Sequence, residues 1–412
     1  MSGVGARVAI RTLGCKVNRV ESDAIVADLL ARGARIVPED EAAVVVINTC
    51  TVTGEADAKA RKAVRRALKS SGSPVVIVTG CLAALDAAAL SALGERVVVE
   101  PDKTQLAVRV GELLGLVDDA CEPVVRAGEG FRTRAMLKIE AGCDNFCSYC
   151  IVPHARGAPR GTPLVEVLRD ARDLVEAGAR EIVLTGINIG RYQDATTGAD
   201  LAELIGAVAQ TGVSRLRLSS IEPPDLTQRL LGVLCDTPAV CEHLHVPLQS
   251  GSNAVLSAMG RTYTAEEYAE RIEEARGAID GLAVTTDVIA GFPGEGDEQH
   301  TETLAFVERM GFAKLHVFRY SARRGTPAAG MEQVAAEVRA RRASELRAVG
   351  ERLRDRYARS RSGVEAEVLV EGVKGGVMTG TTRDYLRVST QAEARTTAGD
   401  VARVRLPPRG IR

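Results

Sequence analysis

Tryptophan is absent from this chain of 412 residues, and aromatic residues make up only 3% of it. Stacking of nucleobases on aromatic side chains is a common way of holding single-stranded RNA. With so few aromatic rings, base stacking cannot be the main mode by which this protein would bind RNA. The chain also lacks any apolar run near the roughly 18 residues of a membrane helix, and its start, "MSGVGARVAIRTLGC", lacks the features of a signal peptide. We therefore expect a cytoplasmic protein without a membrane partner.

A strong net charge is also lacking, since 53 Lys plus Arg nearly balance 54 Asp plus Glu. The charge is unevenly spread, however. Residues 331–412 carry 17 basic and 11 acidic side chains, a net charge of +6, and residues 1–330 carry a net charge of −7. The C-terminal fifth is therefore where a phosphate backbone would bind. The alternative is an arginine-rich helix that faces solvent and pairs with glutamates.

Short β-branched runs alternate with helical patterns over the first 118 residues. Strands are expected in "RVAIRTLG", "AVVVINT" and "PVVIVTG", and helices at 20–30, 58–68 and 82–93. Apolar strands separated by amphipathic helices indicate a parallel, doubly wound sheet. Residues 1–118 are therefore predicted to form one α/β domain, and a linker is expected at 119–133.

A second alternating series begins at Ala135. Its six strand candidates, each followed by a helical stretch, are "AMLKIEA", "EIVLTGI", "RLRLSS", "HLHVPLQ", "LAVTTDVIAG" and "KLHVFRY". They predict a partial or complete (β/α) barrel in a domain at 125–360, with its chemistry at the carboxyl ends of the strands. A long arginine-rich helix is expected at 331–360. Residues 361–412 have short alternating runs that predict a small antiparallel β-barrel or sandwich.

Nine cysteines are present, an odd number that argues against disulfide pairing in a reducing compartment. Cys15, Cys50 and Cys81 each follow one of the three N-terminal strands. Because the carboxyl ends of parallel strands share one edge of a sheet, the three thiols are expected to converge there. The alternative, three unrelated small buried residues, is common for single cysteines. This ordinary buried role is our expectation for Cys121, Cys235 and Cys241.

A second group of cysteines lies in "AGCDNFCSYC", directly after the first strand of the barrel series. Cys143, Cys147 and Cys150 form a C-x3-C-x2-C pattern on a loop of the kind that builds barrel active sites. Thiolates at this density suit zinc or an iron-sulfur cluster. A structural zinc site needs a fourth ligand, for which His154 is the local candidate. A cluster held by three thiolates instead leaves one iron open to a substrate or cofactor.

This loop, with Tyr149 before its last cysteine, resembles the signature of radical S-adenosylmethionine (SAM) enzymes. Together with the upstream cysteines, the segments "TLGCKVN", "CSYCIVPHARG", "LTGINIG", "HLHVPLQSGS", "AMGRTY" and "IAGFPGE" resemble the methylthiotransferases over nearly the whole chain. Lys16, Val17 and Asn18 resemble the branch that methylthiolates threonylcarbamoyladenosine beside the anticodon of tRNA. The isopentenyladenosine branch tends to have Gln and Met after the first cysteine, and the branch acting on a ribosomal-protein aspartate tends to have Pro-Lys-Asn.

The resemblance implies two 4Fe-4S clusters. The catalytic cysteines of the C-x3-C-x2-C loop would hold the cluster that cleaves SAM to a 5'-deoxyadenosyl radical. Cys15, Cys50 and Cys81 would hold an auxiliary cluster, whose open iron carries the sulfur methylated by a second SAM. The radical would remove hydrogen from C2 of the adenine, where the methylthio group is then delivered. The implied partners are tRNA and a reductant protein such as a flavodoxin or ferredoxin.

Residues at strand ends are the candidates for binding SAM. Tyr149 could pack near the adenine, and glycines allow close approach of the backbone. Glu222 and Gln249 are candidates for polar contacts to the ribose or the methionine end. A turn or packing role is the alternative for each, since glycine-rich strand ends are common in turns. The full set of candidates is Tyr149, Gly186, Asn188, Glu222, Gln249 and Gly291.

RNA-binding residues are not fixed by the sequence. The candidates are the basic stretch "KARKAVRRALK" at 59–69, the arginine-rich helix and the C-terminal domain, which resembles the RNA-binding TRAM barrel. Phosphate contacts there would give affinity that depends on salt. The family usually has a Ser-Arg pair after "ARG", whereas this chain keeps Arg160 but has Gly161 and Thr162 in place of the pair.

Two competing hypotheses remain. The chain could be a non-catalytic RNA-binding protein in which iron-sulfur clusters or zinc serve only as structural cross-links. That hypothesis requires each metal to be fully ligated by protein, whereas each group offers three neighbouring thiols. The other is a radical SAM enzyme of a different reaction type, with an auxiliary cluster but no methylthiolation.

Overall fold

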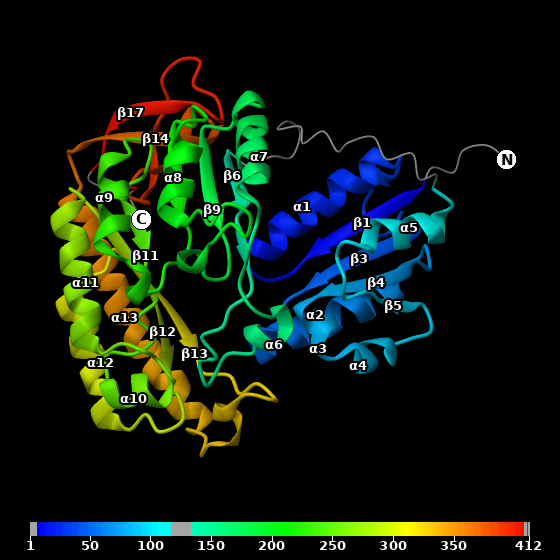
Figure 1. The fold of residues 1–412 in the computed structure, drawn as a ribbon, viewed down its shortest axis with the longest axis horizontal. Helices are drawn as coiled ribbons and strands as arrows, with labels where there is room; N and C mark the ends of the chain where they lie inside the picture. The colour runs from blue at the N-terminus through cyan, green and yellow to red at the C-terminus, as the bar shows by residue number, and fades with distance from the viewer. Residues whose placement is uncertain (1–5, 117–132, 408–409, 411–412) are drawn as a thin grey trace.

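Three regions of β-structure follow one another in the computed structural model, which describes residues 6–116, 133–407 and 410 (Figure 1). The first is a five-stranded parallel sheet, the second consists of two three-stranded parallel sheets, and the third is a four-stranded antiparallel sheet. Cys121 and nearly all of the expected linker lie outside the described residues.

The N-terminal sheet contains the three predicted strands and two short additional ones. β1 (Arg7–Thr12), β3 (Val44–Thr49) and β4 (Val75–Gly80) run parallel side by side. β2 (Arg35–Ile36) lies beside β1, and β5 (Val97–Val99) lies beside β4. Strands of two or three residues carry too little alternation to be recognised in a sequence.

Helices cover both faces of this sheet. Alternate residues of β3 pack on opposite sides, with Val46 in one hydrophobic cluster and Ile47 in the other. The first cluster includes residues of α1 (Lys16–Ala31) and α5 (Leu106–Leu114). The second includes residues of α2 (Gly54–Leu68), α3 (Cys81–Leu85) and α4 (Ala87–Ser91). The predicted parallel sheet is confirmed, and both its faces are buried as a continuous apolar run requires.

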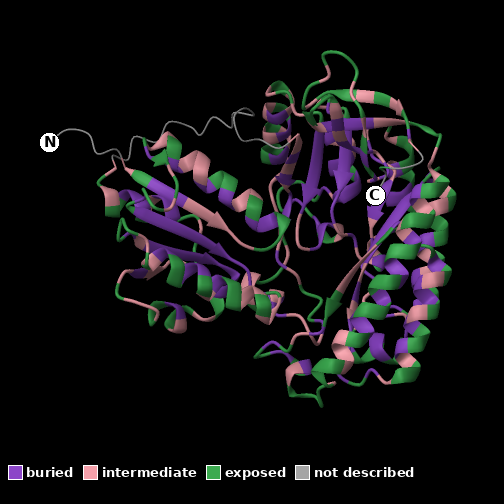
Figure 2. Ribbon diagram, turned by 180° about the vertical axis from the view of Figure 1, so that it is seen from behind, coloured by how far each residue is buried: buried purple, intermediate pink, exposed green. Residues whose placement is uncertain are grey.

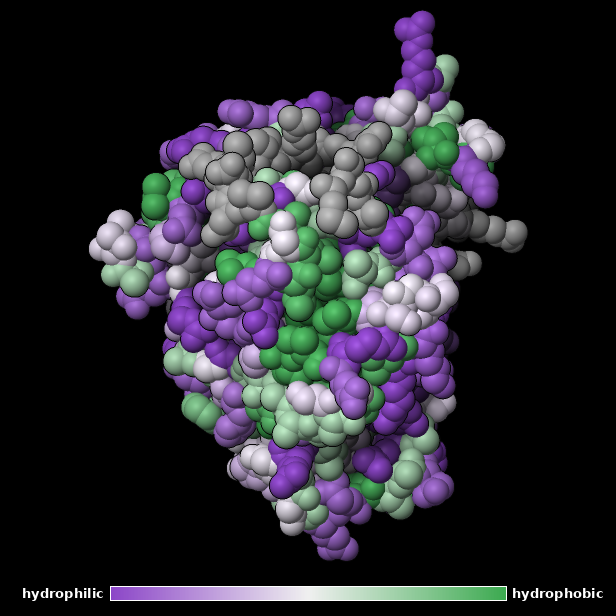
Figure 3. Space-filling model, turned by 90° about the vertical axis from the view of Figure 1, so that its right-hand side faces the viewer, coloured by the Kyte–Doolittle hydropathy of each residue, from purple (hydrophilic) through white to green (hydrophobic). Residues whose placement is uncertain are grey.

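The outer side of this N-terminal region faces away from the central strands. Hydrophobic side chains gather there among hydrophilic ones (Figure 3). Leu30, Ile36 and Leu113 are exposed hydrophobic residues of the same region. The cysteines lie at the opposite end of the sheet, where the strands end.

All six strands predicted in the second series are present and parallel. They form two sheets in the orders β10-β9-β6 and β11-β12-β13. Isolated parallel bridges join Leu216 to Val240 and Ser220 to His245, so that β10 lies next to β11. The strands are β6 (Arg134–Lys138), β9 (Glu181–Thr185), β10 (Arg215–Leu218), β11 (His243–His245), β12 (Ala283–Ala290) and β13 (Lys314–Arg319).

Helices cover the outer side of the central strands, and β9, β10 and most of β11 and β12 are buried (Figure 2). One hydrophobic cluster from Ala135 to Leu353 joins these strands and helices into a single core. Capping boxes at Asp200 and Thr264 satisfy amide groups in the first turns of two helices. The helices are α6 (Val152–Arg156), α7 (Leu164–Glu176), α8 (Leu201–Ala209), α9 (Gln228–Asp236), α10 (Asn253–Ala258), α11 (Ala265–Ala278), α12 (Asp297–Met310) and α13 (Ala336–Ser360), and the 3-10 turns are η1 (Ile189–Arg191), η2 (Pro223–Asp225) and η3 (Pro327–Gly330). None of the helices in the described ranges is long and apolar enough to cross a membrane.

The C-terminal strands form a four-stranded antiparallel sheet in the order β16-β15-β14-β17. Its strands are β14 (Glu365–Lys374), β15 (Val377–Thr382), β16 (Arg387–Gln391) and β17 (Val401–Arg405). The N–H of Ser389 in β16 donates to the carbonyl of Gly410, at 2.9 Å. The end of the chain therefore reaches the edge of the sheet opposite to β17.

Two buried arginines, Arg215 and Arg217, connect this C-terminal sheet to the central strands. Both bond to Glu181 at the start of β9, at 2.9 and 2.8 Å. Their guanidinium groups also donate to the carbonyl groups of residues 381–383 at the end of β15. Tyr385 lies beneath Arg217, whose guanidinium carbon is 4.9 Å from the ring centroid. The C-terminal sheet thus covers the amino ends of β9 and β10 and leaves their carboxyl ends to the cysteine loop.

Candidate active site between two groups of cysteines

The first group of cysteines lies at the carboxyl ends of three adjacent parallel strands, as predicted. Cys15 follows β1, Cys50 follows β3, and Cys81 follows β4 at the start of α3. Burial raises the pKa of the Cys50 thiol, and the nearby Cys15 and Cys81 add to the rise. The three thiols therefore act on one another, and all three belong to one edge of the sheet.

Two glycines allow this convergence. Gly14, which precedes Cys15, has φ +99°, and a Cβ there would lie 2.2 Å from the Cβ of Cys50. Gly80, which precedes Cys81, has φ +92°, and a Cβ there would lie 2.4 Å from the Thr49 carbonyl oxygen. Only glycine combines this backbone conformation with such close contact. The Gly-Cys pairs in the sequence are thus part of the site.

The second group lies on the loop between β7 (Glu140–Ala141) and β8 (Arg160–Gly161), a short antiparallel pair that the sequence did not reveal. The Cys143 N–H donates to the Gly157 carbonyl at 3.0 Å, and the Cys150 N–H to the Cys147 carbonyl at 2.9 Å. These bonds fix the backbone of the loop after β6. The three cysteines of the pattern are therefore held on one ordered turn.

Two thiols of this second group, those of Cys143 and Cys150, are hard to ionise unless a cation is bound beside them. Burial, together with the neighbouring Cys147 and Cys143, raises the pKa of Cys150 to about 12. Burial and Cys147 also raise the pKa of Cys143. A metal ligand must be a thiolate, and a positive ion next to the sulfur reverses such a shift. The donor set therefore fits a metal centre.

The spacing of the thiols argues against a single zinc ion. Sulfur ligands about 2.3 Å from a tetrahedral zinc lie about 3.8 Å apart. Among the described residues, the three ligand atoms found within 4.8 Å of one another belong to His245, Asp287 and His316, and not to either group of cysteines. Neither group of thiols therefore has the compact spacing of ligands around one ion. His154, the local zinc candidate, is exposed and its ring contacts Phe146 edge-on, with 6.0 Å between centroids.

Arg261 lies next to the cysteine loop and was not among the predicted site residues. Its Nη1 donates to the Sγ of Cys147 at 3.2 Å, and its Nη2 pairs with the Glu222 carboxylate. Its guanidinium carbon lies 4.8 Å from the centroid of the Tyr263 ring, and its Nε donates to the Tyr263 hydroxyl. Arg261 belongs to the quoted segment "AMGRTY", but only the fold brings it to the cysteines.

Among the predicted SAM contacts, Tyr149 lies within the cysteine loop and Glu222 lies beside it. The Tyr149 ring meets Phe292 edge-on, with 6.4 Å between centroids. Glu222 is close enough to Cys143 to contribute to its raised pKa. The structure therefore brings these two candidates together with the second group of cysteines.

The glycine candidates contact protein side chains. A Cβ on Gly186 would lie 2.8 Å from Oε2 of Glu140, and a Cβ on Gly291 would lie 2.3 Å from Cγ of Arg339. Packing against these neighbours already requires glycine at both positions. This is the packing role that was the alternative to SAM binding. Gln249 has φ +70°, and both its backbone N–H and its carbonyl group form hydrogen bonds with β12.

Asn188 is buried among carboxyl groups at the carboxyl end of β9. Its N–H and that of Ile187 donate to Oε2 of Glu140, at 2.9 and 2.8 Å. Burial raises the pKa of Glu140 to about 7, against the effect of these two bonds. Burial also raises the pKa of the neighbouring Asp225 to about 6, with Arg191 acting against the rise. These two carboxyl groups were not predicted from the sequence.

Arg156 joins the cysteine loop to the N-terminal sheet. Its Nη1 donates to Glu21 at 2.9 Å, and its Nη2 donates to the side chain of Asn18 at 2.6 Å. Lys103 and Lys138 also pair with Glu21. Burial alone would raise the pKa of Glu21, but Arg156 and Lys103 lower it to about 2. A buried anion with three cations therefore fixes the two units together.

The two groups of cysteines lie on adjoining elements. Helix α3 begins at Cys81 and packs against α6, which begins two residues after Cys150. A cavity of about 490 Å³ opens between the units, lined by Cys81 and Lys103 on one side and by Lys138 and Arg156 on the other. The N-terminal sheet thus turns its cysteine edge toward the cysteine loop.

A second contact joins the units on the other side of α2. Arg323 donates to the Thr51 hydroxyl and to Asp57, both at 2.6 Å. The Gly54 N–H donates to the Ser321 hydroxyl at 2.9 Å. Thr51 directly follows Cys50, so this contact also starts beside a cysteine of the first group.

The basic segments differ in how far their side chains pair with acidic side chains. In α2, which includes most of the stretch at 59–69, Lys59 pairs with Glu55, and both side chains are exposed. In α13, Arg342 is buried against Glu295 and Asp297, and Arg352 and Arg356 pair with Glu308. The arginine-rich helix therefore fits the alternative hypothesis, in which its arginines pair with acidic side chains of the same protein. Helix α13 starts at residue 336, five residues later than predicted.

The remaining described cysteines stand apart from both groups. Cys235 is exposed at the end of α9, and Cys241 is buried near Arg217. Arg160, at the departure from the family pattern, is exposed and donates to the Arg156 carbonyl at 3.1 Å.

Parallel central strands with a three-cysteine loop after the first of them define a radical SAM protein. Residues 137–307 match the model of the Radical SAM superfamily, and residues 7–99 match that of the Uncharacterized protein family UPF0004. The chain is 40% identical to the threonylcarbamoyladenosine tRNA methylthiotransferase MtaB of Bacillus subtilis (strain 168), over 93% of this chain and 90% of that protein. The chain belongs to the radical SAM tRNA methylthiotransferase family.

Other relatives support the same family. The protein of the same name from Thermotoga maritima is 34% identical over 92% of this chain and 90% of its own length. The tRNA-2-methylthio-N(6)-dimethylallyladenosine synthase of Syntrophobacter fumaroxidans is also 34% identical, over 96% and 92%. Among solved structures, the radical SAM methyltransferase TsrM from Kitasatospora setae matches with a TM-score of 0.57 and 15% identity, over 79% of this chain and 77% of that one. That structural likeness concerns the fold alone.

Proposed function

We propose that this protein methylthiolates C2 of N6-threonylcarbamoyladenosine next to the anticodon of tRNA. The observation that carries the proposal is the pair of three-cysteine groups on adjoining elements, each one ligand short of the four that a closed metal site needs. The relatives named for threonylcarbamoyladenosine reach 40% identity, and the dimethylallyladenosine synthase described above reaches 34%. This difference favours the threonylcarbamoyl substrate over the isopentenyl one.

In this proposal, Cys143, Cys147 and Cys150 hold a 4Fe-4S cluster that leaves one iron for SAM, and Cys15, Cys50 and Cys81 hold an auxiliary cluster. When bound, these cofactors supply one-electron cleavage of SAM and the sulfur that enters the product. Tyr149, Glu222 and Asn188, at or near the cysteine loop, are the proposed SAM contacts.

The protein's own residues would position and shield this chemistry. The positively charged guanidinium of Arg261 donates a hydrogen bond to the Cys147 sulfur and orients the Glu222 carboxylate. Arg156 and Glu21 hold the edge of the N-terminal sheet against the cysteine loop. Burial of Cys50, Cys81 and Cys147 excludes water from the sulfur atoms. A site built on strand ends of two joined units suits a reaction in which two centres act on one base.

The finer architecture and the partners are part of the same proposal. The domains are taken as 1–118, 125–360 and 361–412, with the six central strands as a partial (β/α) barrel. The C-terminal sheet is taken as a TRAM-like barrel, which the bond between Ser389 and Gly410 supports. The protein would act in the cytoplasm, on tRNA, with electrons from a flavodoxin or ferredoxin.

The test is anaerobic reconstitution with iron and sulfide, followed by incubation with SAM, reductant and tRNA that carries threonylcarbamoyladenosine. The expected product is a nucleoside whose mass increases by that of a methylthio group replacing hydrogen. tRNA carrying isopentenyladenosine serves as the competing substrate, and faster turnover of that tRNA would contradict the proposed specificity.

Variants of the cysteines separate the two groups. Cys143→Ala is expected to abolish both 5'-deoxyadenosine and the methylthiolated nucleoside, whereas Cys50→Ala should abolish only the latter. Cys235→Ala, an exposed cysteine outside both groups, is the matched control and should retain both products. A non-catalytic RNA-binding protein would yield neither product with the wild-type chain.

A further inference from the structure

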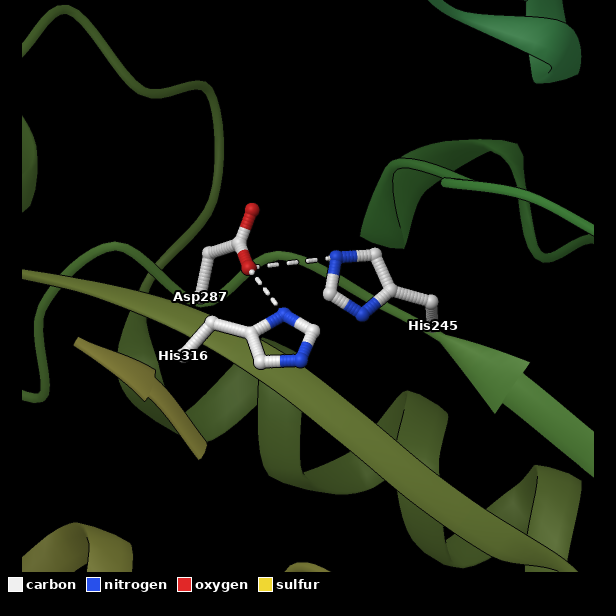
Figure 4. A group of neighbouring side chains, drawn as sticks. All are labelled: His245, Asp287 and His316. Carbon is white, nitrogen blue, oxygen red and sulfur yellow. Dashed lines mark hydrogen bonds and ion pairs between the residues drawn. The ribbon is translucent and has the colours of Figure 1, made fainter. Parts of the chain in front are cut away.

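Two histidines and an aspartate, one from each of the last three central strands, meet in the structure (Figure 4). His245 ends β11, Asp287 lies in β12, and His316 lies in β13. The Nε2 of His245 is 3.3 Å from Oδ1 of Asp287, and the Nδ1 of His316 is 3.2 Å from the same oxygen. One ligand atom from each of the three residues lies within 4.8 Å of the others.

These distances are those of ligands around a single metal ion. Nitrogen and oxygen ligands about 2.0–2.1 Å from a tetrahedral zinc lie about 3.3–3.4 Å apart. Two of the three edges of the group already have this length. The third edge, between the histidines, can shorten by a rotation of the His316 ring, whose side chain is 38% exposed.

The strands hold the group in place. Asp287 and His316 are direct neighbours in the register of β12 and β13. His245 pairs with Thr285, two residues before Asp287 and on the same face of β12. The Nδ1 of His245 lies 2.9 Å from the Thr285 hydroxyl, which leaves its Nε2 directed at Asp287. An outer hydrogen bond that orients a histidine ring is a regular feature of metal sites.

The charge of the group also favours a cation. Two ring nitrogens are directed at one oxygen of the Asp287 carboxylate. Either protons or a metal ion must lie between these atoms, since an unprotonated ring nitrogen repels a carboxylate oxygen.

We propose that His245, Asp287 and His316 bind one divalent first-row transition-metal ion, such as zinc or iron(II), inside the central strands. Two imidazoles and one carboxylate suit these ions, whereas magnesium and calcium prefer oxygen ligands alone. Three protein ligands leave a coordination position open, so the ion can take water or an oxygen of a ligand. The group contains no cysteine of either set, and the proposal does not depend on the proposed reaction.

The test measures zinc binding by the holoenzyme with both clusters loaded, by anaerobic equilibrium dialysis and metal analysis. The wild-type protein is expected to retain one equivalent of zinc. His316→Gln should bind zinc at least tenfold more weakly, and so should Asp287→Asn. The visible absorbance of the clusters must stay constant, because zinc that displaced iron from the cysteines would reduce it.

Two controls make the result decisive. His154→Gln removes an exposed histidine outside the group and should retain the full equivalent of zinc. Zinc should also raise the Tm of the wild-type protein, since a ligand of the native state stabilises it, and should leave the Tm of His316→Gln unchanged. Equal zinc binding by the wild type and His316→Gln would overturn the proposal and assign the group to a protonated hydrogen-bond network.

Discussion

The guanidinium of Arg156 and the carboxylate of Glu21 form an ion pair across the boundary between the N-terminal sheet and the central strands. The two side chains are 8% and 9% exposed, and the pair joins residues that are 135 positions apart. Asn18 and Glu21 follow Cys15 by three and six residues, and Arg156 follows Cys150 by six. A movement of one cysteine group relative to the other would therefore break this pair.

Replacing Glu21 is expected to change how stability depends on pH. The pKa of Glu21 is lowered from 4.5 to about 2, so the ionised side chain stabilises the fold above pH 4.5 and loses this contribution toward pH 2. Between pH 5 and pH 2 the free energy of unfolding of the wild type should fall by roughly 3 kcal/mol more than that of Glu21→Gln. Urea denaturation across this range measures both, and parallel profiles would refute the prediction.

Replacing Arg261 is expected to make the adjacent cluster harder to reduce. Arg261→Gln removes a positive charge at 3.2 Å from the Cys147 sulfur, and positive charge stabilises the more negative, reduced state. A hydrogen bond to a charged group contributes about 1.5–3 kcal/mol. If roughly half of this energy distinguishes the reduced from the oxidised cluster, the reduction potential falls by on the order of 50 mV in the variant.

The potential is measured by redox titration of the reconstituted protein followed by electron paramagnetic resonance. Arg229→Gln is the control, because Arg229 is 56% exposed and pairs with Asp200 on the outer helices. An unchanged potential in Arg261→Gln would show that its contact with Cys147 does not tune the cluster.

Replacing Gly14 is expected to disrupt the first group of cysteines. Gly14→Ala places a Cβ 2.2 Å from the Cβ of Cys50, in addition to the cost of its φ of +99°. Gly33→Ala is a matched control, because Gly33 also has a positive φ, +84°, but nothing lies within 4 Å of an added Cβ. The control should lose about 1–2 kcal/mol of stability.

Iron analysis after reconstitution distinguishes the two variants. Gly33→Ala should retain about eight iron atoms per chain, the content of two 4Fe-4S clusters, whereas Gly14→Ala should retain about four. Full iron content in Gly14→Ala would mean that the site tolerates the displacement of Cys50.

Replacing Arg217 is expected to loosen the C-terminal sheet. Arg217→Met removes one of two cations from the buried Glu181 and leaves the carbonyl groups of residues 382 and 383 without their donor. Removing one partner of a buried ion pair costs about 3–5 kcal/mol. Urea denaturation should show this loss, and limited proteolysis should cut more readily near residue 361.

Arg387→Met is the control for this prediction, because Arg387 is 69% exposed and pairs with Glu371 at 3.5 Å. Its effect on stability should be below about 1 kcal/mol, as for most surface pairs. A comparable loss in both variants would show that the buried network does not fix the sheet.

The strands and the positions of the cysteines at their ends were predictable because both follow short-range rules. Apolar runs of six to ten residues marked all six central strands, although β11 itself has only three residues, and the position of Cys15, Cys50 and Cys81 after strands placed them at one sheet edge. In contrast, β2, β5 and the β7-β8 pair have only two or three residues per strand and were not marked by separate runs of this kind.

The residues that surround the cysteines were not predictable, since they are brought together through space. Arg261 reaches Cys147 over 114 positions, and Arg156 reaches Glu21 over 135. No local pattern marks such a partner. Gly186 and Gly291 illustrate the reverse case, because a glycine at a strand end does not reveal whether a ligand or a neighbouring side chain occupies the space beside it.

The buried arginines of β10 have a consequence for the order of biosynthesis. Their carbonyl partners at residues 381–383 lie 165 or more positions further along the chain. Until those residues leave the ribosome, Arg215 and Arg217 lack these acceptors, and the amino ends of β9 and β10 remain uncovered. The cysteines of both groups are all translated by residue 150, well before the C-terminal sheet can cover the amino ends of β9 and β10. A metal that binds these cysteines during translation would therefore meet a chain whose core is still incomplete.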